Sequence, residues 1–335
     1  MSKYIFFILI YQIFITISLI KISKTKGLID IPNNRKIHTS PIPYTGGLTL
    51  SLTYIFIIYL TEIEYVFLNL ILAYAFIISL TGFIDDRYNV RPGTKLLLQS
   101  VPIFFLIDQN LYLTNLGSYS FLGVLELGAM DKIFTFLCCL LLINAFNYND
   151  GIDGLLPSIS IIILLSFVIF LIFYGSIEYK NFLLVTFPLT IFLFFNFGLI
   201  KKFKIFLGDS GSNLLGFIIS FISIFLFIEM KIHPAIIIWP LAYTVYEFLS
   251  ITCFRILENK GTFKPGRDHL HYELIKILKI NQYISLSIIL LINIILIIIG
   301  FYIFHKLGPD ISLIFFILFF LIYLVFKYSI RKLSS

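Results

Sequence analysis

Charged residues are scarce in this sequence of 335 residues. Asp, Glu, Lys and Arg make up 13% of it, about half of their usual share in a soluble domain, whereas 59% of the residues are hydrophobic. A water-soluble fold has too little interior to bury so much apolar surface. The composition therefore excludes a large soluble core and predicts a protein embedded in the lipid bilayer.

Cysteine is also rare, with Cys138, Cys139 and Cys253 all placed in apolar runs. Their spacing does not fit a zinc site, and the adjacent pair is not expected to form a disulfide. We expect small buried apolar residues. The formal net charge is +7. In a membrane protein, such an excess indicates which side of the bilayer holds the positive residues, so no nucleic-acid partner is expected.

Long apolar runs dominate what remains, and a helix needs about 20 residues to cross the hydrocarbon core. The sequence predicts an all-α polytopic membrane protein with about eleven transmembrane helices in a single domain, 1–335, because no linker or clear repeat interrupts it. Three glycines in 108–131 indicate a small hairpin or interfacial flap. The expected spans are 4–20, 46–61, 66–84, 95–107, 132–147, 155–175, 181–199, 213–230, 234–254, 282–304 and 310–327.

The distribution of Lys and Arg predicts the orientation. The first apolar run is followed, not preceded, by most of its basic residues and by no small-residue cleavage site, which indicates a retained span with its N-terminus outside. With alternating spans, the C-terminus and the loop 255–281 are cytoplasmic. All but five of the 25 basic residues then lie inside, and those outside are Lys3, Lys132, Lys180, Lys231 and Lys306.

Two adjacent carboxylates, Asp85 and Asp86, close the third expected span. Like charges at a membrane surface repel each other, so such a pair indicates a cation, a base or a proton relay. A solvated helix end beside Arg87 is the simpler alternative. Lys95, at the start of the next span, is placed to meet a phosphate.

The segment 144–155 is the richest in polar groups, reading Asn-Ala-Phe-Asn-Tyr-Asn-Asp-Gly-Ile-Asp-Gly-Leu. Asn144 and Asn147 are three residues apart and share a face on a helix, and Asp150 and Asp153 repeat the spacing. The glycines allow the backbone to turn closely around a ligand. Amide and carboxylate oxygens suit a hard cation or nucleotide edges, and a plain turn needs no such set.

A third motif, Gly-Asp-Ser-Gly-Ser at 208–212, opens the eighth expected span after three lysines. Free N–H groups at a helix start favour an anion, and Asp209 adds a candidate metal ligand. A helix cap beside a basic flank would also explain the motif. Basic residues before Gly46-Gly47, including Arg35 and Lys36, likewise suit an anion.

The longest inside loop carries Arg267, His269 and His271. These side chains offer hydrogen-bond donors to phosphate oxygens. A His-x-His pair also permits zinc, but no cysteine is near and the other histidines are scattered. An exposed basic loop without a task is the remaining alternative.

Together, the motifs resemble those of the polyprenyl-phosphate N-acetylhexosamine-1-phosphate transferases, a branch of glycosyltransferase family 4. These include the undecaprenyl-phosphate GlcNAc-1-phosphate transferases and the phospho-MurNAc-pentapeptide translocase. The resemblance extends from Arg35 to Tyr272, and the runs at 144–155 and 208–212 are its specific parts.

This resemblance implies an enzyme that transfers a sugar-1-phosphate, such as GlcNAc-1-phosphate, from a UDP-sugar to polyprenyl (undecaprenyl) phosphate and releases UMP. It implies Mg²⁺, with Mn²⁺ as a substitute, and a site on the cytoplasmic face of the inner (plasma) membrane. The product would start a lipid-linked glycan of the cell envelope, such as lipopolysaccharide, O-antigen or teichoic acid. A homodimer is compatible with this interpretation.

The resemblance also implies roles for single residues. Asp209, with Asn147, would hold the metal on the diphosphate, while Asp85 or Asp86 would handle the acceptor phosphate. The catalytic candidates are therefore Asp85, Asp86, Asp150 and Asp153, the substrate-binding candidates are Lys95, Asn144, Asn147, Arg267, His269 and His271, and the metal-ligand candidates are Asp209 and Asn147.

Two departures favour the GlcNAc-transferase-like branch over the peptidoglycan translocase. Tyr272 stands where the family often has the last residue of His-x-His-His, and Glu247, eight residues before Arg255, replaces an Asp. The sequence leaves open whether the carboxylates deprotonate the acceptor, position it or form a covalent intermediate. A transporter is the alternative function, but it should place ionisable groups at mid-membrane, where Glu247 is the main example.

Overall fold

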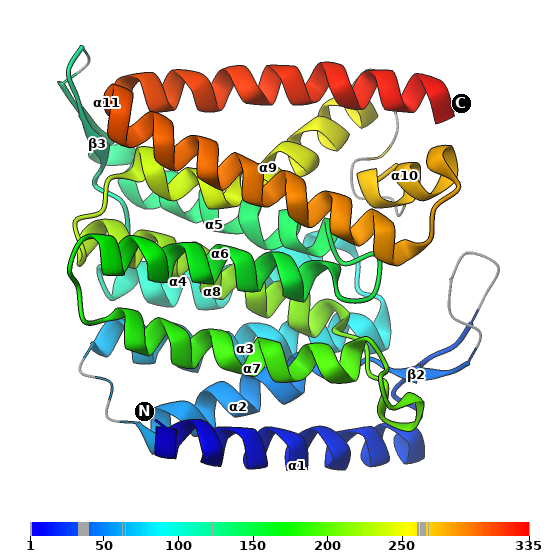
Figure 1. Ribbon diagram of the computed structural model, residues 1–335. Coiled ribbons are helices and arrows are strands. Elements are labelled where there is room, and N and C mark those ends of the chain that lie inside the picture. The colour runs from blue at the N-terminus through cyan, green and yellow to red at the C-terminus, as the bar shows by residue number, and fades with distance from the viewer. Residues whose placement is uncertain are drawn as a thin grey trace.

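The computed structural model describes residues 2–32, 40–61, 63, 65–121, 123–259, 261, 266 and 268–334. It is a bundle of helices with two short two-stranded sheets (Figure 1). The helices are α1 (Ser2–Lys26), α2 (Gly46–Leu60), α3 (Val66–Tyr88), α4 (Pro92–Asp108), α5 (Asp131–Tyr148), α6 (Leu155–Phe173), α7 (Tyr179–Asn196), α8 (Gly208–Ile228), α9 (Pro234–Leu257), α10 (Leu270–Leu278) and α11 (Gln282–Ser334).

Eight of the described helices are long and apolar enough to cross a membrane. The all-α prediction is confirmed, and every expected span falls on a helix. However, α2 and α4 have only 15 and 17 residues. The last two expected spans belong to α11, which consists of two helices joined by a kink at Gly308 (φ 87°, ψ 173°). Glycine tolerates this positive φ, and Pro309 follows it.

The expected hairpin in 108–131 is present as β3 (Asn115–Tyr119) and β4 (Gly123–Glu126), an antiparallel pair. The other sheet joins β1 (Ile29–Asp30) to β2 (Ile42–Pro43) on either side of residues outside the described part. Two 3₁₀ turns, η1 (Gly128–Met130) and η2 (Lys201–Phe203), precede α5 and α8.

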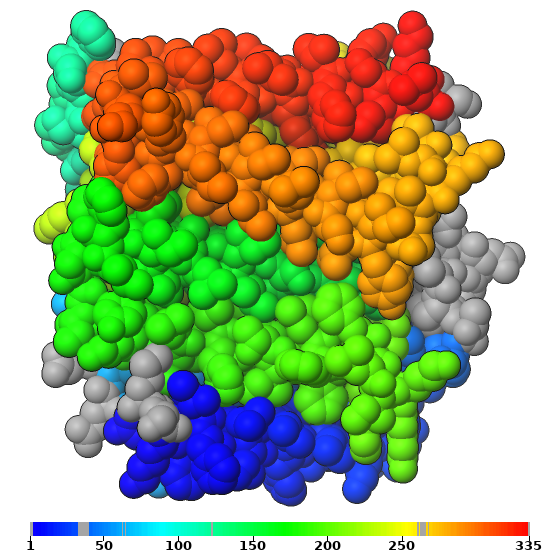
Figure 2. Space-filling model, in the orientation of Figure 1, coloured from blue at the N-terminus to red at the C-terminus, as the bar shows by residue number. Residues whose placement is uncertain are grey.

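The N-terminus and the β3–β4 hairpin lie at one end of the bundle, and α10, β2 and the C-terminus lie at the other (Figure 1). The outer surface stays apolar, with Phe14, Phe194 and Ile298 among its exposed large side chains. Figure 2 shows one face of the molecule, where α1, α7, α6 and the first half of α11 lie one above the other from bottom to top. An apolar outer surface is what a lipid-embedded bundle requires.

Helix α8 forms the centre of the bundle, since 83% of its most apolar stretch is buried. Its start is held by α2, because the N–H groups of Gly46 and Gly47 donate to the carbonyls of Phe206 and Leu207 at 3.0 and 2.9 Å. A Cβ on Gly47 would overlap the backbone of Gly211. Only glycine permits this approach, which brings the Gly-Asp-Ser-Gly-Ser motif against two other helices.

Gly82 of α3 makes the same kind of contact, since a Cβ there would overlap the carbonyl of Asp209. We expect Gly82→Ala to lower the melting temperature of the detergent-purified protein, with a cost of about 1–3 kcal/mol from overpacking. Gly93→Ala is the matched control, because this exposed helical glycine has nothing within 4 Å of its Cβ position. Equal melting temperatures for the two variants would contradict the packing argument.

Candidate active site

A cavity of about 1070 Å³ lies at the end of the bundle that holds α10. Helix ends and loops far apart in the sequence contribute to its wall, which places the polar motifs around one space. Arg267 lies outside the described residues. The other predicted site residues all line the cavity, namely Asp85, Asp86, Lys95, Asn144, Asn147, Asp150, Asp153, Asp209, His269 and His271.

Lys95 joins three helices at the centre of this cavity. Its Nζ lies 2.7 Å from Oδ2 of Asp85 and 2.6 Å from Oδ2 of Asp209. Pro92 at the first turn of α4 presets the helical backbone that places Lys95 there. The ammonium thus offsets part of the repulsion between two carboxylates that the fold brings together.

The neighbouring Asp86 has a different environment. Its two carboxylate oxygens accept hydrogen bonds from the N–H groups of Asp209, at 2.9 Å, and Ser210, at 3.1 Å. It therefore caps the start of α8, where free N–H groups and the helix dipole favour a negative charge. From the sequence, we expected these N–H groups to bind a substrate anion. In the structure, two of them donate hydrogen bonds to the carboxylate of Asp86. The catalytic role expected for Asp86 stays a prediction.

Asn147 completes the surroundings of Asp209. Its Nδ2 donates to Oδ1 of Asp209 at 2.8 Å and to the Ser212 hydroxyl at 2.9 Å. Its side-chain carbonyl oxygen, Oδ1, has no hydrogen-bond partner among the described residues and is available as a ligand atom. Asn144 and Asn147 both lie on α5, as their spacing predicted.

Asn144 lies deeper and contacts a residue that the sequence analysis missed. Its Nδ2 donates to Oε1 of Gln99 at 3.3 Å, and Nε2 of Gln99 donates to Oδ1 of Asn213 at 3.1 Å. These amides join α5, α4 and α8 below the cavity. A signal was present, because Gln99 follows Lys95 by four residues and Asn213 follows Asp209 by four, so each pair shares a helix face.

The two aspartates of the 149–154 segment separate, because this segment is a turn rather than a helix. Asp153 pairs with Lys204 at 2.6 Å. The carboxyl group of Asp150 has no hydrogen-bonding or ion-pair partner among the described residues. Burial, together with the nearby charges of Asp209 and Asp153, raises the pKa of Asp150 to about 8. Its carboxyl group therefore lacks a cationic partner and is largely protonated near pH 7.

His269 and His271 stack on the same wall, with ring centroids 5.5 Å apart and an interplanar angle of 14°. Burial lowers the pKa of His269 to about 4 and that of His271 well below its usual range. Both rings are therefore neutral near pH 7 and act through single N–H donors rather than as cations. Neither ring nitrogen of His271 has a hydrogen-bond partner in the described structure.

The fixed positive charge on this wall comes instead from Arg255, which the sequence analysis did not assign to the site. Its Nε and Nη2 donate to the two oxygens of Asp268 at 2.8 and 2.7 Å. Although burial alone would raise it, the pKa of Asp268 is lowered to about 2 by this bidentate contact. Arg255 also lies over the ring of Tyr148, 5.4 Å from its centroid.

The donor set of the cavity fits a hard divalent cation. Asp85, Asp150 and Asp209 supply carboxylate oxygens and Asn147 an amide oxygen, the ligands that Mg²⁺ accepts. Among the described residues, no group of three or more His, Cys, Asp or Glu side chains is close enough to form a closed metal cage. A closed zinc site is thus not built there, whereas Mg²⁺ typically completes its shell with water and phosphate oxygens.

Comparison with known proteins connects this geometry to a family. Residues 67–227 match the family model described as glycosyl transferase family 4. An undecaprenyl-phosphate alpha-N-acetylglucosaminyl 1-phosphate transferase of Escherichia coli O157:H7 is 30% identical over 262 residues, which cover 75% of this chain and 70% of the relative.

Two relatives with the same name come from other bacteria. That of Pasteurella multocida (strain Pm70) is 33% identical over 260 residues, covering 75% of this chain and 72% of the relative. That of Yersinia pestis is 28% identical over 281 residues, covering 81% and 76%. The matched segment 67–227 contains the carboxylates and amides that surround Lys95. The chain therefore belongs to glycosyl transferase family 4, as a membrane-embedded transferase of the polyprenyl-phosphate sugar-1-phosphate type.

Proposed function

We propose that this transferase moves GlcNAc-1-phosphate, or a closely related N-acetylhexosamine-1-phosphate, from a UDP-sugar to undecaprenyl phosphate and releases UMP. The observation that carries the proposal is the meeting of Asp85, Lys95 and Asp209 in one polar cavity at the end of an apolar bundle. A soluble nucleotide and the head group of a membrane lipid can both reach such a place.

The donor diphosphate would bind where the carboxylates of Asp209 and Asp150 and the amide of Asn147 face the cavity. Asp209, with the carbonyl oxygen of Asn147, would hold Mg²⁺, and Mn²⁺ would serve in its place. When bound, this cation neutralises charge on the diphosphate and on the departing UMP. The neutral rings of His269 and His271 would donate hydrogen bonds to the same oxygens, as Arg267 was expected to do.

The acceptor phosphate would bind beside Asp85 and Lys95. In the proposed reaction, one of its oxygens bonds to the phosphorus that carries the sugar, and the bond from this phosphorus to the bridging oxygen breaks. Lys95 would orient the acceptor through charge-assisted hydrogen bonds. Asp85 would position it or accept a proton, while Asp86 keeps the start of α8 in place.

The remaining two aspartates take separate parts in this proposal. Asp150, which has no counter-charge, would face the cation and the nucleotide phosphates. Asp153 would fix the turn through its ion pair with Lys204. The shape of the turn, and not a shared helix face, would then place both near the nucleotide.

The positive residues support a cytoplasmic position of the cavity. The cavity lies at the end where α10 and the C-terminus are found (Figure 1), which the Lys and Arg distribution assigns to the cytoplasm. UDP-sugars are made in the cytosol, so this side of the plasma membrane suits the donor. A transporter is disfavoured because the carboxylates that line the cavity gather at one end of the bundle instead of along a path at mid-membrane.

Asp209→Asn tests the centre of the proposal. With UDP-GlcNAc, undecaprenyl phosphate and Mg²⁺, we expect UMP release to fall at least roughly 100-fold, because a metal ligand and the partner of Lys95 are both weakened. Asp108→Asn is the control, since this exposed aspartate lies at the opposite end of α4. Wild-type protein that released no UMP from any UDP-sugar of a panel would refute the proposed reaction.

Asp150 predicts a pH dependence of stability in metal-free buffer. Its folded-state pKa, about 8, exceeds its unfolded value, so the stabilisation from its bound proton is complete at low pH and disappears as pH rises through about 8. Asp150→Asn should therefore gain melting temperature relative to wild type between pH 5.5 and pH 8.5. Parallel melting curves for the two proteins would show that Asp150 is not protonated in the folded state.

Thiol labelling tests the orientation. In a variant without native cysteines, Lys306→Cys and Lys279→Cys place exposed thiols at opposite ends of the bundle. A membrane-impermeant maleimide should label position 306 in intact cells and position 279 only after the cells are opened. The reverse pattern would place the cavity outside the cell.

A further inference from the structure

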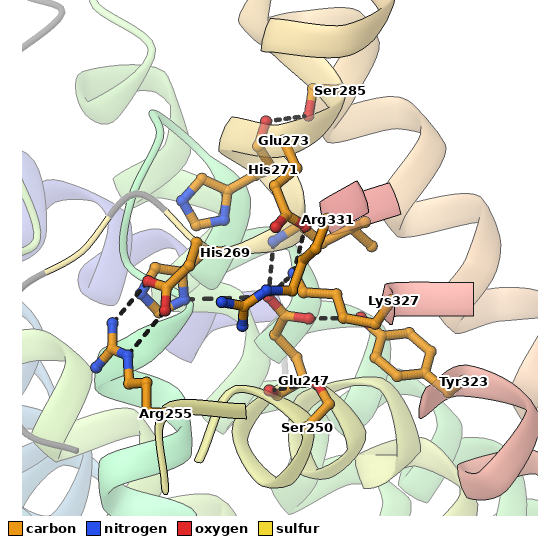
Figure 3. Close-up of polar contacts among 12 residues, drawn as sticks. Glu247, Ser250, Arg255, His269, His271, Glu273, Ser285, Tyr323, Lys327 and Arg331 are labelled. Carbon is orange, nitrogen blue, oxygen red and sulfur yellow. Dashed lines mark hydrogen bonds and ion pairs between the residues drawn. The ribbon is translucent and has the colours of Figure 1, made fainter. Parts of the chain in front are cut away.

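Glu247, Glu273 and Lys327 form a buried ionic cluster. It lies behind the cavity wall that carries His269 and His271, and none of its three residues lines the cavity. Nζ of Lys327, on α11, lies 3.0 Å from Oε1 of Glu247, on α9, and 2.8 Å from Oε2 of Glu273, on α10 (Figure 3). The side chains of Lys327 and Glu247 are fully buried. One ammonium thus links three helices where they meet.

This arrangement is costly to build, because each buried charge loses its hydration. The losses are offset only when every group finds partners, and Glu247 does so. Its Oε2 accepts from the hydroxyl of Tyr323 at 2.6 Å, and its Oε1 accepts from the N–H of Leu270 at 2.6 Å. Apolar side chains would fill the same space without this cost, so the cluster needs an explanation beyond packing.

The explanation lies in α10, which the cluster contacts at two positions, Leu270 and Glu273. Leu270 is its first residue, and the preceding His269 provides no side-chain cap. Glu247 therefore supplies the cap from another helix, and Lys327 holds Glu273 in the first turn. A helix of nine residues is too short to be stable alone, so these two contacts fix where α10 begins.

Helix α10 in turn shapes the cavity beside the 149–154 turn. The hydroxyl of Tyr272 donates to the carbonyl of Gly151 at 2.9 Å. The ring of His271 packs so closely on Gly151 that a Cβ there would overlap its Nε2. Movement of α10 would thus displace both the His271 ring and the turn that carries Asp150.

We infer that Lys327 is a positioning residue for the segment His269–His271, and that the half of α11 after Gly308 thereby helps to position one wall of the site. This role rests on the proposed function of the histidines at the donor diphosphate. It lies outside the match to the family model, which ends at residue 227. Lys327 touches no substrate in this arrangement and acts through Glu247, Glu273 and α10.

The first experiment needs no substrate. Hydrogen–deuterium exchange would be measured on the full-length protein in detergent for wild type, Lys327→Met, Lys327→Arg and Lys306→Met. Lys306 is the matched control, an exposed lysine on the same helix. We expect amides 270–274 to exchange roughly tenfold faster or more in K327M, with α8 unchanged, and wild-type rates in K306M. In K327R, α10 should stay protected.

The second experiment separates positioning from general damage by steady-state kinetics with UDP-GlcNAc and undecaprenyl phosphate. For K327M we expect kcat/KM for the donor to fall roughly tenfold or more, with the KM for the acceptor within about twofold of wild type. A global loss of structure would affect both substrates. Absent activity in wild type would refute the proposed function and leave the exchange result interpretable.

The double variant K327M/E273Q covers the case in which K327M does not fold. It removes one of the two carboxylates that K327M leaves without a counter-charge, since Lys327 pairs with both Glu247 and Glu273. It should therefore recover part of the melting temperature but keep the fast exchange of α10 and the poor donor kinetics. Full recovery of exchange and kinetics would mean that Lys327 is only a counter-charge, and the inference would be overturned. Wild-type exchange in K327M would overturn it equally.

Discussion

The structure depends on the docking of the α8 N-terminus against α2 and α3. Gly47 and Gly82 allow backbones to approach where any Cβ would collide, and the carboxylate of Asp86 bonds two N–H groups at the start of α8. Because Asp209 stands in this first turn, its position is set by backbone contacts rather than by its own side chain. Lys95 and Asn147 then reach its two oxygens from α4 and α5.

The electrostatics of the cavity follow from this docking. Carboxylates from α3, from the 149–154 turn and from α8 are brought into one space, and Lys95 and Lys204 neutralise only part of their charge. Burial, together with this remaining negative charge, raises the pKa of Asp150. A site with an excess of buried negative charge attracts a divalent cation and, through it, a diphosphate. Membership of glycosyl transferase family 4 agrees with that chemistry.

The opposite wall is built by a different principle. Because the histidines are neutral, they can act only through correctly oriented N–H donors. The orientation of these donors depends on the position of α10. Buried ion pairs are poor sources of stability but good at fixing register. The cluster of Glu247, Glu273 and Lys327 fits that use. It joins the second half of α11 to α9 and to the α10 wall of the site.

Much of this protein could be predicted from its sequence. Apolar runs separated by polar segments determined the all-α fold, and every expected span lies on a helix, because hydrocarbon forces the backbone to satisfy its own hydrogen bonds. Motif spacing also identified Asn144 and Asn147 as one helical face. Only one of the two α4 residues was predicted from the sequence. Lys95 follows the Asp85-Asp86 pair closely in the chain, whereas Gln99 lies within an apolar run.

The sequence by itself therefore determined which segments are helices and which residues carry chemistry, since periodicity and composition are local properties. Only the tertiary structure decided what each polar group contacts. Asp85 forms an ion pair with Lys95, whereas Asp86 accepts a hydrogen bond from the start of α8. Asp153 pairs with Lys204, while the carboxyl group of Asp150 has no partner among the described residues. Glu247 pairs with Lys327. These choices depend on how helices distant in sequence pack, and no local pattern encodes the direction of a side chain across such a contact.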